Sequence, residues 1–287
     1  GTQSWFTSTS SYLDYSLFSA KQKAVKGNYT SSHWNNEELQ NSLQKDIEHL
    51  SHLQQSATRI EPGKYRCYLA PAAVHELIHL FQWQGLSESA IRQGQSGFIS
   101  ARLGSKLFSP KILIQEDYRL GLGPRFNEHG EPSPEIVTLV AESKLQNSLI
   151  NRRTAKEFGL VSNGADALES IRSIHIHGGK LQNDAILQAL GTGLFISNLH
   201  YTNWSDLQLG RITGLTRYAC FWVENGKIAA PFETMRFDET IYNILGEKLE
   251  DLTTETRLFA STETYEQRSL GGSRIPGVLL SSFSLTL

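Results

Sequence analysis

A chain of 287 residues is long enough to bury a sizeable core and predicts one large domain or two modest ones. Its 27 Lys and Arg residues against 29 Asp and Glu residues leave no positive excess to follow a phosphate backbone, which argues against nucleic-acid binding. The two cysteines cannot build a disulfide framework, and the absence of a membrane-length apolar run or a signal-peptide pattern predicts a cytoplasmic protein without membrane contact.

The first predicted elements are a β-hairpin and a helix. Residues 5–32 are rich in Thr, Ser, Tyr and Phe, and Gly27-Asn28 is the expected turn. Residues 37–55 follow with apolar side chains close to a 3.6-residue period. Asn35 or Asn36 is suited to cap that helix.

A short strand then leads into a second helix. Residues 65–69 form the expected strand, and Pro71 suits the first turn of the helix that follows. Apolar residues recur at i, i+3, i+4 and i+7 and predict a face turned toward the core; they are Val74, Leu77, Ile78 and Phe81. We expect Gly85 to end this helix.

The polar side of the same helix carries a His-Glu-x-x-His motif. His75 and His79 are one helical turn apart, so both imidazoles can bind one zinc ion, and Glu76 lies about 100° round the helix from His75. Glu76 is then placed to act as general base on a water molecule that the metal activates. The alternative is an amphipathic helix whose polar side happens to hold these three residues, since so short a motif also occurs by chance.

Further candidate ligands lie elsewhere in the chain. Cys67 is on the strand before the motif, although a buried and unreactive thiol is the other interpretation. Residues 173–177 alternate as a strand, which places His175 and His177 together on one face. Such a pair can hold a metal ion, but polar residues on the outer face of a half-exposed strand produce the same pattern.

The rest of the sequence predicts loops and a β-rich C-terminal part. A Gly-rich and Pro-rich loop occupies residues 121–134. Asn225-Gly226 is a strong hairpin signal because this pair accommodates positive φ angles. The expected strands are 194–201, 214–223, 227–232 and 277–285, with a helix over 238–245.

Three segments resemble the C-terminal signature of the TldD/PmbA family. They are residues 193–206 (GLFISNLHYTNWSD), 210–217 (GRITGLTR) and 223–227 (VENGK). Residues 105–110, 125–134 and 151–155 are similar to the central region of the family, and residues 59–77 to the approach to its metal helix.

The resemblance implies an α+β protein with two lobes. The N-terminal lobe would be an α+β remnant with the metal-motif helix, and the C-terminal lobe would be rich in antiparallel strands. We interpret residues 1–60 as the C-terminal part of a truncated N-terminal α+β domain and residues 61–287 as the C-terminal domain of the TldD/PmbA type.

The resemblance also implies a zinc peptidase that degrades short or unfolded peptides or matures peptide precursors, with a peptide substrate and a homodimeric or heterodimeric assembly with a family paralogue. His75 and His79 would be metal ligands and Glu76 the catalytic base. Family members are also known as modulators of DNA gyrase, a role to which the charge balance adds nothing.

Two departures from the family pattern favour a second hypothesis. The active family subunit resembles His-Glu followed by three residues and a His, whereas two residues intervene here. It also has a cysteine ligand near the C-terminus, where residues 262–272 contain none; Glu263 or Glu266 would have to substitute. The chain would then be a non-catalytic PmbA-like partner subunit. A peptide-binding module built on Tyr201, Trp204 and Trp222 is a third alternative.

Overall fold

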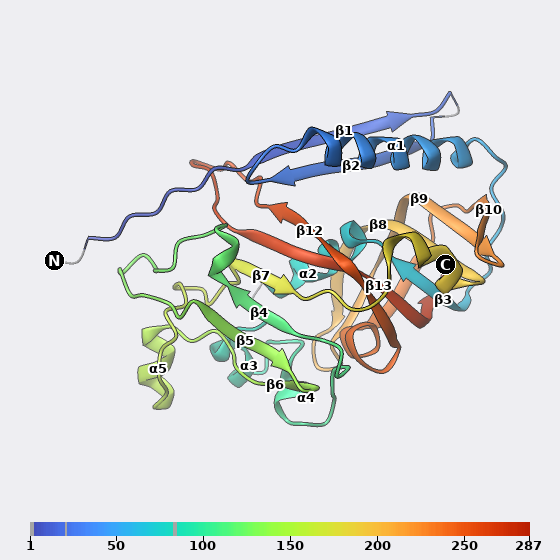
Figure 1. Ribbon diagram of the computed structural model, residues 1–287. Coiled ribbons are helices and arrows are strands. Elements are labelled where there is room, and N and C mark those ends of the chain that lie inside the picture. Colours follow the sequence, from blue (N-terminus) through green and yellow to red (C-terminus); the bar gives the residue numbers. More distant parts are fainter. Residues whose placement is uncertain (1–2, 21, 83–84) are drawn as a thin grey trace.

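The computed structural model describes residues 3–20, 22–82 and 85–287, which form a mixed α+β fold (Figure 1). A two-stranded sheet and helix α1 (Asn36–Leu53) lie across one side of an 11-stranded mixed sheet in the described residues. The predicted α+β class is confirmed. The division at residue 60 stays a prediction.

The secondary structure of the described residues is strand-rich. The other helices are α2 (Pro71–Gln82), α3 (Glu88–Arg92), α4 (Ile99–Arg102), α5 (Arg152–Phe158) and α6 (Ile186–Leu190), with shorter turns η1 (Tyr118–Leu120), η2 (Asn183–Ala185) and η3 (Asn243–Glu247). The strands are β1 (Ser11–Phe18), β2 (Ala24–Ser31), β3 (Gly63–Leu69), β4 (Ile114–Asp117), β5 (Ile136–Ala141), β6 (Lys144–Leu145), β7 (Ser173–Ile176), β8 (Gly193–Asp206), β9 (Arg211–Glu224), β10 (Lys227–Pro231), β11 (Arg236–Thr240), β12 (Leu249–Ala260) and β13 (Gly272–Leu285).

The N-terminal hairpin forms, but its turn is not where the sequence indicates. Phe18 pairs with Ala24, so the chain reverses between them, and Gly27 pairs with Tyr15 inside β2. A Cβ atom on Gly27 would come within 2.2 Å of the Tyr15 ring. Gly27 therefore allows that ring to lie flat across the strand, and the prediction of a turn at this glycine is wrong.

Helix α1 begins where a capping asparagine was expected. The Asn35 side-chain oxygen accepts hydrogen bonds from the main-chain N–H groups of Glu37 and Glu38, at 3.0 and 3.3 Å. The helix packs on the large sheet through His49, whose ring lies 5.3 Å from that of Phe195. This contact joins the N-terminal layer to a second small core on that face of the sheet.

The large sheet is organised around its last strand. Along the main path the order is β10-β9-β8-β3-β13-β7-β4-β5-β6, and β13 also pairs with β12 and β11. Most pairs are antiparallel, but β13 is parallel to β7, and β3 is parallel to β8. The Asn225-Gly226 turn between β9 and β10 is confirmed, with φ angles of 50° and 74°.

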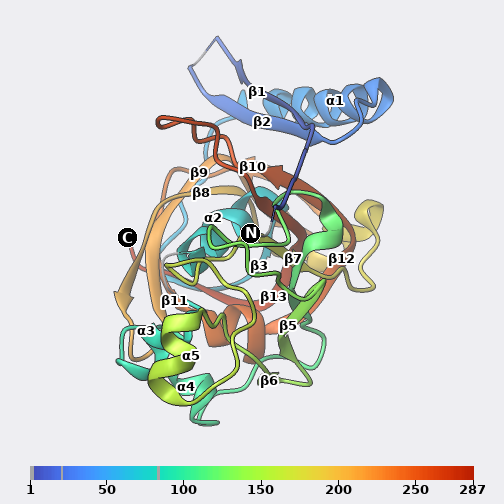
Figure 2. The same cartoon turned by 90° about the vertical axis from the view of Figure 1, so that its left-hand side faces the viewer.

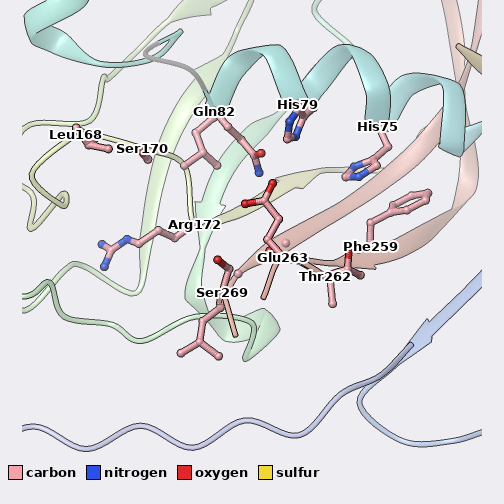
Figure 3. Close-up of a pocket in the computed structure, with 16 residues that line it drawn as sticks. His75, His79, Gln82, Leu168, Ser170, Arg172, Phe259, Thr262, Glu263 and Ser269 are labelled. Atoms are coloured by element: carbon pink, nitrogen blue, oxygen red, sulfur yellow. The ribbon is translucent and has the colours of Figure 1, made fainter. Parts of the chain in front are cut away.

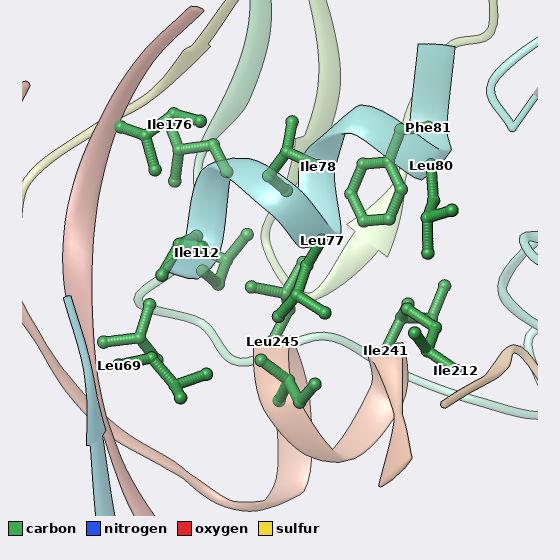
Figure 4. Packing of buried hydrophobic residues seen from close by; sticks show 14 of the residues in the cluster. Leu69, Leu77, Ile78, Leu80, Phe81, Ile112, Ile176, Ile212, Ile241 and Leu245 are labelled. Atoms are coloured by element: carbon green, nitrogen blue, oxygen red, sulfur yellow. The ribbon is translucent and has the colours of Figure 1, made fainter. Parts of the chain in front are cut away.

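Helix α2 lies inside the curve of the large sheet (Figure 2). The predicted apolar face is confirmed, since Val74, Leu77, Ile78 and Phe81 are all at most 3% exposed. They pack against side chains from several strands and from the η3 turn (Figure 4). The helix thus shares the core of the large sheet and does not belong to the N-terminal layer, in which the two-lobe expectation placed it.

Several local expectations differ from the structure. The helix expected over residues 238–245 is only partly present: residues 238–240 belong to β11, which pairs with β9, and the helical segment that follows runs over residues 241–247 and includes the π-helical η3 turn. Strand β12 was not predicted from the sequence. The end of α2 at Gly85 involves residues 83 and 84, which lie outside the described residues.

Candidate active site

The polar side of α2 forms one wall of a pocket of about 780 Å³ (Figure 3). From α2 the pocket is lined by His75, His79 and Gln82. The facing walls come from the segment before β7 and from the connection between β12 and β13. The two histidines of the motif therefore open onto a cavity large enough for several residues of a peptide.

His75 is held in a defined orientation. Its Nδ1 atom lies 3.0 Å from the Ser273 hydroxyl oxygen, and its ring stacks on Phe259 at 4.3 Å with an interplanar angle of 5°. Burial, with a smaller contribution from His79, lowers the pKa of His75 to about 4. The ring is thus neutral at pH 7, and in the tautomer with Nδ1 as donor, Nε2 keeps a lone pair for a metal ion.

His79 and Glu76 are neighbours on the helix but differ in their exposure to the pocket. His79 is exposed and lines the pocket with His75. Glu76 is half-buried and is not among the lining residues. Burial raises its pKa, against the opposing influence of His79, His200 and Lys26, and its main-chain oxygen accepts a hydrogen bond from the Thr202 hydroxyl at 3.2 Å. Its assignment as the base stays a prediction.

The donor atoms at the pocket fit a metal ion in part. Glu263 extends from the opposite wall toward the part of α2 that carries His79 and Gln82 (Figure 3). Two imidazoles and a carboxylate are a ligand set that zinc accepts. Within residues 3–20, 22–82 and 85–287, however, no three His, Cys, Asp or Glu side chains are grouped closely enough to hold a metal ion. A shift of the Glu263 side chain or loop is needed to complete the set.

The second histidine pair is not part of this pocket. Ile174 and Ile176 are buried in the core, which leaves His175 and His177 on the other face of β7. Their rings stack on each other at 3.9 Å, and Asp117 lies 3.2 Å from the His175 Nδ1 atom. This pair is the polar outer face of a strand.

Neither cysteine lines the pocket. Cys67 and Cys220 are buried free thiols, and burial raises the pKa of both. Cys67 is fully buried on β3, which agrees with the interpretation of an unreactive core thiol.

Several pocket residues carried no recognisable sequence signal. Arg172 donates hydrogen bonds to the Ser133 hydroxyl and the Gly164 carbonyl oxygen, both at 3.0 Å, and to the carbonyl oxygen of Phe126 at 2.9 Å. It thereby ties the 121–134 loop to the pocket wall. Phe259, which lines the pocket, and Ser273, which does not, also escaped prediction, because they meet His75 only through the pairing of strands distant in sequence.

Similar folds occur in several solved structures. A protein described as a proposed modulator of a DNA gyrase from Thermotoga maritima aligns with a TM-score of 0.76 and 18% identity, covering 96% of this chain and 61% of that protein. TldE from Thermococcus kodakarensis aligns with a TM-score of 0.78 and 14% identity, covering 96% and 62%. A further proposed gyrase modulator, from Bacteroides thetaiotaomicron, has a TM-score of 0.73 and 16% identity, with coverage of 96% and 59%.

These likenesses show the fold, and the chain spans about three fifths of the length of the proteins it matches. No match was found among curated proteins. None of the helices in the described ranges has both the length and the apolar character required to span a membrane.

A family model gives the assignment at the level of sequence. The model described as the PmbA/TldA metallopeptidase C-terminal domain matches residues 62–287. This range contains α2, the pocket walls and all of the large sheet. The chain belongs to the TldD/PmbA family of metallopeptidase-like proteins, as its C-terminal signature predicts.

Proposed function

We propose that this chain carries the active site of a cytoplasmic zinc-dependent peptidase that hydrolyses short or unfolded peptides or matures peptide precursors. The observation that supports it most is that His75 and His79, one helical turn apart, line the same peptide-sized pocket. Membership of a metallopeptidase-like family agrees with this proposal. No described helix suits a membrane span.

In the proposed site, His75, His79 and Glu263 would hold the metal once the Glu263 side chain or loop has moved toward the histidines. Zinc, when bound, supplies a Lewis acid for the scissile carbonyl. Ser273 and Phe259 fix the His75 ring, which saves the entropy of ordering a ligand. Glu76 takes a proton from the attacking water and returns it to the leaving amine. This role requires the carboxylate to turn toward the pocket from its half-buried position.

Cleavage of an unfolded peptide by purified protein with zinc tests the proposal. We expect Glu76→Gln to lower kcat/KM by about 10²-fold or more while bound zinc is retained. Glu263→Ala should lower zinc affinity, whereas Glu266→Ala, in the same loop but outside the pocket lining, should not. Equal cleavage rates for wild type and Glu76→Gln would refute the assignment of the base.

A specific observation favours a second candidate function. Because no three potential ligands are grouped in the described part of the chain, the protein is alternatively a non-catalytic subunit that assembles with an active family paralogue. It would then bind no zinc, and adding it to the paralogue would raise the paralogue's cleavage rate. Stoichiometric zinc in protein purified without chelator, lost in His75→Ala, would exclude this alternative.

A further inference from the structure

Two exposed leucines line the pocket on the walls that face α2. Leu168 is 68% exposed and Leu270 is 46% exposed, and both line the pocket together with the buried Ile171 and Phe259. Leucines in water at the rim of a cavity contribute nothing to the core. Apolar surface gathered at a cavity is instead typical of a surface that a ligand covers.

The backbone beside Leu168 is fixed in an unusual conformation. Glu169 has a φ of 53°, which side chains of this size rarely adopt, and it is only 2% exposed. Its carboxylate accepts hydrogen bonds from the main-chain N–H groups of Ser89 and Asn151, at 3.0 and 2.9 Å, and from the Ser87 hydroxyl at 2.5 Å. Such a conformation persists where the surroundings enforce it, so Leu168 is presented by a rigid support.

The backbone beside Leu270 is equally constrained. Gly271 has a φ of 112°, and a Cβ atom there would lie 2.5 Å from the Arg172 carbonyl oxygen. Its N–H donates to the carbonyl oxygen of Leu122 at 2.9 Å. Only glycine allows the backbone at residue 271 to lie this close to the backbone of Arg172. This close approach places the neighbouring Leu270 at the pocket.

The charges of the pocket do not favour a charged group beside these leucines. The two terminal nitrogens of the Arg172 guanidinium donate to Tyr118, Ser133 and main-chain oxygens, and its Nε atom, which has no hydrogen-bond partner among the described residues, is buried away from the pocket surface. The Glu263 carboxylate is directed toward the helix that carries the histidines (Figure 3). A charged substrate side chain would lose its water here without gaining a partner, whereas an apolar one would cover apolar surface.

We propose that Leu168 and Leu270 form a specificity subsite that accepts a large apolar side chain of the substrate peptide, close to the bond positioned at the histidines. This inference rests on the proposed function, because the peptide is the ligand that the site is proposed to bind. It adds the substrate class: peptides with a residue the size of Leu or Phe near the cleavage point.

Binding to the Glu76→Gln protein tests the subsite without cleavage. Fluorescein-labelled Gly-Ala-X-Ala-Gly peptides with X as Leu, Phe, Asp or Lys would be compared by fluorescence anisotropy. We expect the Leu and Phe peptides to bind about tenfold more tightly than the Asp peptide. Leu270→Asp should abolish this preference and favour the Lys peptide.

Leu209→Asp is the matched control, since Leu209 is 51% exposed and does not line the pocket. It should leave the preference unchanged. Leu270→Ala, which adds no charge, should weaken binding of the Leu peptide in a protein with wild-type thermal stability. Equal binding of all four peptides, or no binding at all, would overturn the subsite. A preference for Leu in a protein whose wild type never cleaves would support the subsite and overturn the peptidase.

Discussion

The two histidine pairs of this protein have similar sequence patterns and different surroundings. His75 and His79 repeat at helical spacing and face a cavity, whereas His175 and His177 repeat at strand spacing and stack on each other. At the strand pair, Asp117 Oδ2 accepts a hydrogen bond from His175 at 3.2 Å and Gln115 Oε1 accepts one from His177 at 2.8 Å. Spacing places two rings on one face in both cases, but the neighbouring elements decide whether that face can receive a ligand.

We expect the largest difference in zinc binding and cleavage between two variants that each lack one histidine pair. We expect His75→Ala combined with His79→Ala to abolish zinc binding and cleavage, because both proposed protein nitrogens are lost. His175→Ala combined with His177→Ala should retain both properties. Zinc content by elemental analysis and peptide cleavage measure the difference. Loss of zinc from the strand-pair variant alone would reverse our assignment.

Removing the hydrogen-bonding partner of one histidine in each pair should produce a smaller difference in zinc affinity. Ser273→Ala removes the partner that orients His75 and should lower zinc affinity by about 10- to 100-fold, as is usual when a ligand loses its hydrogen-bonding partner. Asp117→Asn removes the partner of His175 and should leave zinc affinity unchanged. Competition with a chelating dye measures both affinities. Identical values for Ser273→Ala and wild type would show that Ser273 does not orient a ligand.

The smallest expected effect concerns stability against pH in metal-free protein. An unfolded histidine has a pKa near 6.5, whereas burial lowers the pKa of His75 to about 4 in the folded protein. Between these values the unfolded chain binds more protons, so stability falls as the pH drops. Wild type should lose about 2 kcal/mol more than His75→Gln between pH 6.5 and 4.

Urea denaturation with EDTA measures this loss. Burial lowers the pKa of His177 as well, but less, so His177→Gln should change the slope less than His75→Gln does. Parallel stability curves for wild type and His75→Gln would show that His75 is not kept neutral by the fold.

The sequence was sufficient for features that depend on neighbours along the chain. The stripe from Val74 to Phe81, the Asn35 cap and the Asn225-Gly226 turn are all local, and each is confirmed. The family signature added the α+β class. Apolar periodicity, helix capping and tight turns each depend on residues within a few positions of one another. These features could therefore be predicted without any knowledge of the tertiary structure.

Features that depend on pairing across the chain could not be predicted in this way. The Gly27-Asn28 pair is typical of a turn, but Gly27 lies beneath the Tyr15 ring inside a strand. Strand β12 is stabilised by its pairing with β13, which the local sequence does not indicate. Ser273 and Phe259 reach His75 only after that pairing. Nothing in the sequence within ten residues of His75 indicates that a hydroxyl and an aromatic ring almost 200 positions later would hold it.

The central place of β13 has a consequence for synthesis on the ribosome. This strand, at residues 272–285, joins β3, β7 and β12 and supplies the hydroxyl beside His75. A nascent chain that has released only the residues before it can form α2 and local hairpins but has no surface on which to assemble the cavity walls. The cavity walls can therefore assemble only after β13 has emerged, so a chain that lacks this strand has no pocket for a ligand.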